Sequence, residues 1–337
     1  MTWFFDQPFT LGEEDRLAAD VAVWLCSPSM RWLVEKMPGR RVAGASAGPL
    51  RWPSRLGAKD EGEGRDDLAG VLARLGEICA WDLPGTVWDY RQGGERRFEE
   101  TPTPASPASQ AGVANHATIL GLRSEGRLHT EPRTYIVLGG RRLAPLNRAR
   151  AAARAMRRQP RNPVRVVMLC GRRPLDRAER ESDEVRSYAS SARTELDLMV
   201  AAAGQVFGAD PAAEVELVEI PDPAPGSRAS TYETLRAVAE EPAAGEGPLA
   251  IVTSPTCRPF QHLEAVRAIG LPTGIACELI AHPPAWASGS PSLLAQPQVY
   301  LQEIRSVIQA AGRLAEALAP AGPSPQPAEF GPRCPSA

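Results

Sequence analysis

An apolar segment that ends in two glycines is the feature that most constrains the fold of this chain. Residues 134–140 read Thr-Tyr-Ile-Val-Leu-Gly-Gly, and an alanine- and arginine-rich segment with helical spacing follows. Glycine lacks a Cβ atom, so it permits a sharp turn and a close approach of the backbone to a ligand. The unpaired N–H groups at the start of the next helix favour an anion. The segment predicts the first strand, turn and helix of a nucleotide-type α/β fold, without the spaced glycines of the full dinucleotide fingerprint.

Strand and helix patterns then alternate through residues 116–318. The strand segments are near-continuous apolar runs, which is typical of a parallel sheet that is buried on both faces. Strands are expected at 135–138, 165–170, 215–220, 249–253 and 274–280, and helices at 146–156, 194–207, 231–240, 259–269 and 299–318. We therefore expect an α/β domain with a Rossmann-like parallel sheet and helices on both of its faces.

The rest of the chain divides into three regions. Residues 1–98 hold every tryptophan except Trp286 and show helical spacing, which predicts an N-terminal helical subdomain with an aromatic core. A ligand lid is the alternative use of these aromatic residues. Residues 99–115 alternate proline with small polar residues, so we expect a semi-extended linker or a surface loop. Residues 319–337 are rich in proline and are expected to be disordered.

Composition argues against several functional classes. The net charge is −2, so no overall positive field points to nucleic acid. No apolar run reaches the roughly 18 residues of a membrane span, and no basic-then-apolar secretory signal opens the chain. The six cysteines form no CxxC pair and have no histidine at zinc-finger spacing, so neither disulfides nor a metal site is expected. We expect a soluble cytoplasmic protein.

Polar residues follow each predicted strand, which is where ligands bind in open parallel sheets. Arginines and hydroxyls there suit phosphate, carboxylate or ribose groups. Taken singly, each hydroxyl has an alternative role as a helix cap, and each arginine has one as a solvated side chain. Taken together, they predict one shared ligand site. Its candidate residues are Gly139, Gly140, Arg141, Gly171, Arg172, Glu195, Ser230, Thr231, Glu233, Thr253, Ser254, Thr256 and Arg258.

Arg258 is the expected anchor of the ligand, because it precedes Pro259, which suits the first turn of a helix. The positive end of that helix would face the ligand. The sequence assigns no catalytic residue. Nucleophilic catalysis by Cys170 or Cys257 is chemically reasonable beside a helix N-terminus and arginines, but neither cysteine has an evident His or Asp partner in the sequence.

The order and spacing of these motifs resemble the YdcF/SanA/ElyC-type family, a domain of unknown function. The resemblance covers roughly residues 134–310. It rests on Ile136–Gly140, Leu169–Gly171, Arg193–Glu195, Ser227–Glu233, Ile251–Thr256 and Tyr300–Glu303. The segment Leu11–Ser27 is similar to the N-terminal helix of the soluble YdcF branch, and the absence of a predicted membrane anchor favours that branch.

The resemblance implies a Rossmann-like domain and, for the YdcF branch, an adenosine-type ligand with S-adenosylmethionine as the named candidate. Many members carry a histidine after the fourth strand, where this chain has Cys257, so an acid–base role is not carried over. Two functional classes stay open. One is a binder of a nucleotide-like small molecule, or a transferase or hydrolase acting on it. The other is a non-catalytic regulatory or cell-envelope-related assembly protein that docks a protein partner through its N-terminal region.

Overall fold

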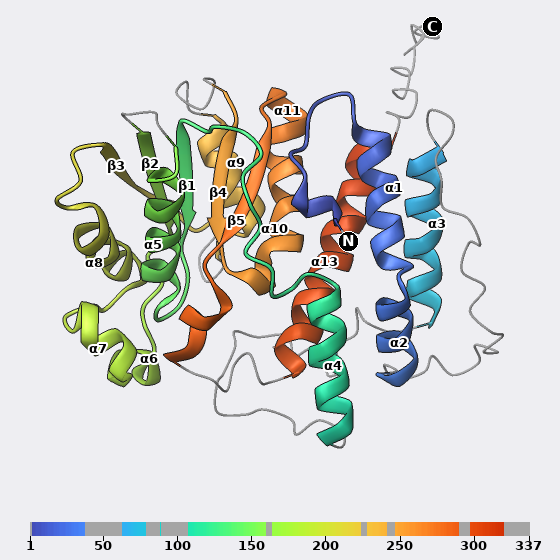
Figure 1. The fold of residues 1–337 in the computed structure, drawn as a ribbon, viewed down its shortest axis with the longest axis horizontal. Helices are drawn as coiled ribbons and strands as arrows, with labels where there is room; N and C mark the ends of the chain where they lie inside the picture. The colour runs from blue at the N-terminus through green and yellow to red at the C-terminus, as the bar shows by residue number, and fades with distance from the viewer. Residues whose placement is uncertain are drawn as a thin grey trace, which may run out of the picture.

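Five parallel strands form the centre of the molecule (Figure 1). The computed structural model describes residues 2–37, 63–78, 88, 107–159, 164–223, 228–240, 247–289 and 297–319. The strands are β1 (Thr134–Leu138), β2 (Val164–Cys170), β3 (Ala213–Glu219), β4 (Leu249–Thr253) and β5 (Cys277–Ala281). They lie in the order β3-β2-β1-β4-β5, and every neighbouring pair is parallel. The predicted Rossmann-like parallel sheet is confirmed.

The strand order reverses between β1 and β4. Ile136 of β1 lies opposite Val167 of β2 on one side and opposite Ile251 of β4 on the other. The chain therefore builds outward from β1 to β3, returns to the centre and continues through β4 to β5. In open parallel sheets, a crevice for ligands forms outside the carboxyl ends of the strands at such a reversal.

Helices cover both faces of the sheet, which is why the strand sequences are apolar throughout (Figure 1). On one face, α5 (Ala144–Met156) and α8 (Glu195–Phe207) pack against alternate side chains of β1 and β2, including Tyr135 and Val166. On the other face, α9 (Thr231–Ala239) and the end of α10 (Arg258–Ala265), with the π-helical turn that follows, cover Ile136 and Val167. Two short helices, α6 (Arg177–Glu181) and α7 (Asp183–Ala189), lie between β2 and α8.

The N-terminal helices form a layer beside the sheet (Figure 1). They are α1 (Glu14–Leu25), α2 (Pro28–Lys36), α3 (Glu63–Ile78) and α4 (Pro107–Ile119). Their apolar side chains, such as Trp24 and Leu68, share one core with Ile304 and Ile308 of the C-terminal helix α13 (Pro297–Leu318). The predicted helical region is thus present, but a helix from the far end of the chain completes its core. The remaining helical turns are Phe4–Asp6, Pro255–Cys257, Val266–Gly270, Leu271–Thr273 and Pro284–Gly289.

Part of the expected linker is helical. Residues 107–115 form most of α4 rather than an extended segment. Pro107 occupies the first helical position, where its missing N–H would have no partner in any case, and small residues continue the helix. The rest of the linker, residues 99–106, and nearly all of the expected disordered tail, residues 320–337, lie outside the described residues. None of the described helices combines the length and the apolar character needed to cross a membrane.

Candidate functional site

A cavity of about 1140 Å³ lies at the carboxyl ends of β1 and β2 and beside the end of β4, where the strand order reverses. The N-terminal parts of α5, α8, α9 and α10 contribute to its wall, as does one side of α13. Each helix start carries a partial positive charge from its unpaired N–H groups. The backbone alone therefore makes this cavity favourable for an anion.

Most of the residues predicted from the sequence do lie around this cavity. Those in its lining are Gly139, Gly140, Arg141, Gly171, Glu195, Ser230, Thr231, Glu233, Ser254 and Thr256. They come from loops after β1, β2, β3 and β4, which the parallel topology brings to one edge of the sheet. Their binding of a ligand stays a prediction. Arg172, Thr253 and Arg258 are not part of the lining.

The prediction that Arg258 lines the cavity is wrong. Its side chain is fully buried, forms an ion pair with Asp6, and lies 4.8 Å from the ring centre of Phe5. As the first residue of α10, Arg258 points toward the N-terminal segment, which packs against this helix. The sequence gives no sign of this contact, because the two partners stand 252 residues apart.

Arg172 and Thr253 also have partners away from the cavity. Arg172 is exposed and pairs with Glu219 at 2.6 Å, which fits its alternative interpretation as a solvated arginine. Thr253 is buried at the end of β4, and its hydroxyl donates to the side-chain carbonyl of Gln261. Gln261 lies in the cavity wall, so Thr253 positions a lining residue from behind.

Arg148 of α5 supplies a buried positive charge that the sequence interpretation missed. The side chain is 5% exposed and lines the cavity. Its guanidinium donates to the backbone oxygens of Leu138, at 3.0 Å, and Gly139. Nε and Nη2 also donate to Oγ of Ser254, at 3.2 and 2.9 Å. These neutral acceptors fix the orientation of the guanidinium without cancelling its charge.

No described carboxylate forms an ion pair with Arg148. Burial lowers the pKa of Arg148, whereas Cys257 and Glu195 raise it electrostatically. An unpaired buried charge is energetically unfavourable, and an anion bound beside it removes much of that cost. A signal for Arg148 exists in the sequence, because it shares a helix face with Ala144 and Ala152 and so interrupts an otherwise small apolar surface.

Gly139 allows an unusually close approach between the end of β1 and the start of α8. A Cβ atom at this position would lie 2.4 Å from Oε1 of Glu195 and 2.9 Å from the backbone oxygen of Leu169. At Gly140, a Cβ would lie 3.2 Å from Nη1 of Arg148. The two glycines therefore leave space at both charged side chains, as the close-approach role of glycine requires.

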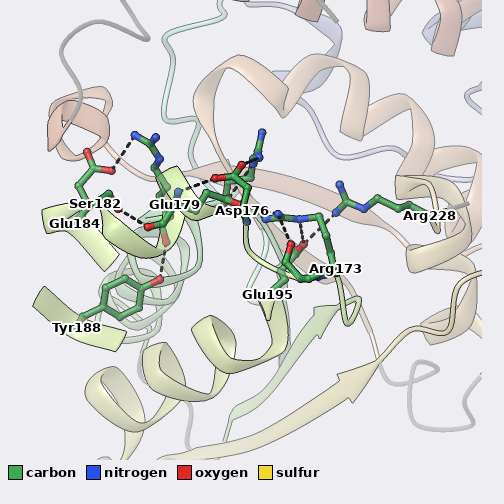
Figure 2. Close-up of polar contacts among 11 residues, drawn as sticks. Arg173, Asp176, Glu179, Ser182, Glu184, Tyr188, Glu195 and Arg228 are labelled. Atoms are coloured by element: carbon green, nitrogen blue, oxygen red, sulfur yellow. Dashed lines mark hydrogen bonds and ion pairs between the residues drawn. The ribbon is translucent and has the colours of Figure 1, made fainter. Parts of the chain in front are cut away.

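The carboxylate of Glu195 is buried at the first position of α8. It accepts hydrogen bonds from Arg228 at 3.0 Å and from Arg173 at 3.4 Å (Figure 2). Burial raises the pKa of Glu195, and the positive charges of Arg228 and Arg173 oppose that rise. The net shift is upward, so Glu195 holds a proton more readily than an exposed glutamate does.

A second carboxylate, Glu179, neutralises the neighbouring arginines (Figure 2). Arg173 donates to both of its oxygens, at 2.7 and 2.9 Å, and Arg141 donates to Oε1 at 2.9 Å. Burial raises the pKa of Glu179, but the hydrogen bonds and charges of Arg173 and Arg141 outweigh this effect and lower it to about 2. Arg141 and Arg173 are therefore compensated, which distinguishes them from Arg148.

Ser230 and Glu233 act as caps of α9, as their alternative interpretation states. Oγ of Ser230 accepts from the backbone N–H of Glu233 at 3.3 Å, and the Glu233 carboxylate accepts from the N–H of Ser230 at 2.6 Å. This reciprocal pair satisfies two N–H groups at the helix start. Both residues line the cavity, but their side-chain oxygens already have partners.

His282 is a further cavity residue that the sequence interpretation missed. It follows β5, is 2% exposed, and has Nδ1 2.9 Å from the backbone oxygen of Pro283. Its pKa is lowered to about 4, first by burial and then by the charge of Arg148, with Pro283 acting in the opposite direction. Its position directly after the fifth strand could have indicated His282. The candidate residues predicted from the sequence included none that follow that strand.

Within the part of the chain that the structure describes, no group of three or more His, Cys, Asp or Glu side chains could hold a metal ion.

Comparison with known proteins adds relatives without an assigned activity. No family model matches the chain, and no solved structure matches it. An uncharacterized protein of Mycobacterium bovis and uncharacterized proteins of two Mycobacterium tuberculosis strains are each 28% identical to it over 302 residues. The matches cover 74% of this chain and 82% of each relative. A functional proposal therefore has to rest on the geometry of the cavity.

Proposed function

We propose that this protein binds an anionic or zwitterionic nucleotide-like small molecule in the cavity at the β1–β4 reversal. The observation that carries the proposal is Arg148, a buried guanidinium in the cavity wall with no ion-pair partner among the described residues. A carboxylate or phosphate of the ligand would supply the missing negative charge.

The surroundings of Arg148 support the same ligand class. Helix starts at α5, α8, α9 and α10 add positive potential, and Gly140 leaves Nη1 of Arg148 free of a covering side chain. The cavity has the size of a site for a nucleotide or cofactor rather than for a single small ion. The buried Glu195 next to Gly139 is an acceptor for ribose hydroxyls.

The resemblance to the YdcF branch agrees with this ligand class and makes S-adenosylmethionine a candidate. A transferase or hydrolase acting on the bound molecule is the corresponding class of enzyme. We also propose a cytoplasmic location, because the cysteines that the structure describes, Cys26, Cys170, Cys257 and Cys277, are all free.

Docking through exposed tryptophans of the N-terminal region finds no support in the described residues. Trp3, Trp24 and Trp88 are buried, and their indole N–H groups donate to backbone oxygens. Trp32 is half-buried and stacks on His116 with the ring centres 4.3 Å apart. These rings belong to the core of the helical layer, so they do not form an exposed docking surface among the described residues.

A titration of two arginine variants tests the proposal. Binding of S-adenosylmethionine, nucleotides, nucleotide sugars and inorganic phosphate is first screened by thermal shift, since a ligand of the folded state raises its melting temperature. Any ligand found is then titrated calorimetrically against Arg148→Met and against Arg150→Met, an exposed arginine on the same helix. Losing a charge-assisted contact costs about 1.5–3 kcal/mol, so Arg148→Met should weaken binding roughly 10- to 150-fold. Equal affinity in the two variants would contradict the proposal.

A further inference from the structure

The described cysteines fall into two groups by accessibility. Cys26, Cys170 and Cys277 are buried, whereas Cys257 is partly exposed and lines the cavity. Burial raises the pKa of Cys170 to about 12 and that of Cys277 to about 12, so both stay protonated thiols. A reactive cysteine has to reach the thiolate form and meet its target. Of the described cysteines, Cys257 has the required access.

Cys257 lies where two positive features meet. It ends the turn Pro255–Cys257 and directly precedes α10, so the residue lies at the positive end of that helix. Arg148 interacts with it electrostatically and carries no competing ion pair. The same guanidinium is also the anchor proposed above for an anionic ligand.

His282 adds a neutral imidazole to the lining of the same cavity. Because the oxygen of Pro283 is only an acceptor, Nδ1 of His282 must donate in their 2.9 Å contact. The imidazole is neutral near pH 7, since its pKa is lowered to about 4. Nε2 therefore carries the lone pair of this imidazole. The side chain is 98% buried and forms part of the cavity wall.

His282 and Cys257 come from neighbouring strand ends. The backbone N–H of His282 donates to the oxygen of Thr253, the last residue of β4, at 3.4 Å. Cys257 follows the same strand after one turn. The parallel pairing of β4 with β5 thus places the segments that carry the thiol and the imidazole at the same end of neighbouring strands, and Arg148 of α5 lines the same cavity.

From this arrangement we propose that Cys257 is a nucleophile that attacks an electrophilic carbon next to the anionic group held by Arg148. The sulfur forms a bond to that carbon while the carbon loses its leaving group, which departs with the bonding electron pair. The thiol proton passes to water in the cavity, because the lowered pKa of His282, about 4, makes its imidazole a poor proton acceptor. The substrate class is a small anion with an activated carbon beside its carboxylate or phosphate. The orientation of the substrate rests on the anion site proposed above.

Paired alkylating reagents test the proposal without knowledge of the natural substrate. Iodoacetate and iodoacetamide differ in charge but share one electrophilic carbon. The rate of labelling at Cys257 is followed by mass spectrometry of its peptide, and each rate is divided by the rate for glutathione. We expect the normalised rate with iodoacetate to exceed that with iodoacetamide by about tenfold, since a charge-assisted contact is worth at least one decade. Arg148→Met should abolish this preference, and Arg150→Met should retain it.

The outcomes separate the nucleophile from the anion site. Labelling of Cys257 by iodoacetamide that is no faster than labelling of glutathione would overturn the nucleophile, whatever the ligand titrations show. Fast labelling with no preference for iodoacetate would support the nucleophile and overturn the role of Arg148. His282→Gln should leave the rate of iodoacetamide labelling at Cys257 nearly unchanged, because the thiol proton passes to water. A rate at least roughly tenfold slower in a folded His282→Gln protein would contradict proton transfer to water.

Discussion

Arg173 and Glu179 form a two-point ion pair at the edge of the cavity, with Nη1–Oε2 and Nη2–Oε1 distances of 2.7 and 2.9 Å. Glu179 is fully buried and also accepts from Arg141. One carboxylate therefore compensates two arginines and ties α6 to the turns after β1 and β2. Arg148 has no such partner, so an incoming anion gains most at Arg148.

Replacing Glu179 should strongly destabilise the fold. Glu179→Gln keeps the shape of the side chain but leaves the buried guanidinium of Arg173 without its main counter-charge. Breaking a buried ion pair from one side costs about 3–5 kcal/mol. Chemical denaturation of Glu179→Gln should show this loss. Glu181→Gln is the matched control, because Glu181 is exposed and its pair with Arg177 contributes little.

The same carboxylate should make stability depend on acid pH. The pKa of Glu179 falls from 4.5 to about 2 in the folded protein, so its contribution to the free energy of unfolding is complete above pH 4.5. That contribution is lost as the pH falls from 4.5 toward 2, because the unfolded state takes up the proton first. The gap in melting temperature between wild type and Glu179→Gln should therefore narrow below pH 4.5. A gap that is constant from pH 7 to pH 3 would refute this assignment.

A methyl group at Gly139 should be tolerated poorly. Gly139→Ala would place a Cβ 2.4 Å from Oε1 of Glu195 and 2.9 Å from the backbone oxygen of Leu169, which cannot rotate away. We expect a loss of about 1–3 kcal/mol in the free energy of unfolding, as for other overpacked sites. Gly204→Ala, at an exposed position in the last turn of α8 with no atom within 4 Å of the added Cβ, should instead gain up to about 1 kcal/mol. Equal melting temperatures for the two variants would contradict the close approach at Gly139.

Asp6→Asn should act on stability and not on ligand binding. It removes the charge that faces the buried guanidinium of Arg258, which lies outside the cavity lining. An uncompensated buried arginine costs about 3 kcal/mol or more. We expect a lower melting temperature with unchanged affinity for any ligand of the cavity. A loss of affinity in a folded Asp6→Asn protein would return Arg258 to the site.

The sheet and the position of the cavity could be predicted because their signals are local. A run such as residues 134–140 contains both the apolar strand and the glycines of the turn. Parallel pairing then places the ends of all strands together, which is how most of the candidate residues reached one cavity. The expected helices, such as the one at 194–207, were found from the 3.6-residue spacing of their apolar faces, whereas α4, α6 and α7 were not expected.

Long-range partners and side-chain directions could not be predicted in the same way. Nothing near Arg258 in the sequence indicates that Asp6 is its partner. Arg148 and Arg150 look alike in the sequence, yet one is buried in the cavity wall and the other is exposed on the far side of α5. A linker was expected in place of the start of α4 because residues 99–107 are rich in proline, although the residues after Pro107 are compatible with a helix. The errors at Arg258 and Arg148 come from a contact and a side-chain direction that only the assembled fold specifies.

The position of helix α13 late in the sequence affects how the chain folds while it is being synthesised. It completes the core of α1 and α3, and its Glu303, Ser306 and Arg313 line the cavity. Because synthesis starts at the N-terminus, α1 and α3 leave the ribosome long before the helix that covers Trp24 and Leu68 exists. Contacts between segments that are far apart in the sequence form slowly, and apolar surface that stays exposed in the meantime is prone to aggregate or to bind chaperones. A chain that is released before α13 is made would therefore lose both the packing of α1 and α3 and one side of the cavity.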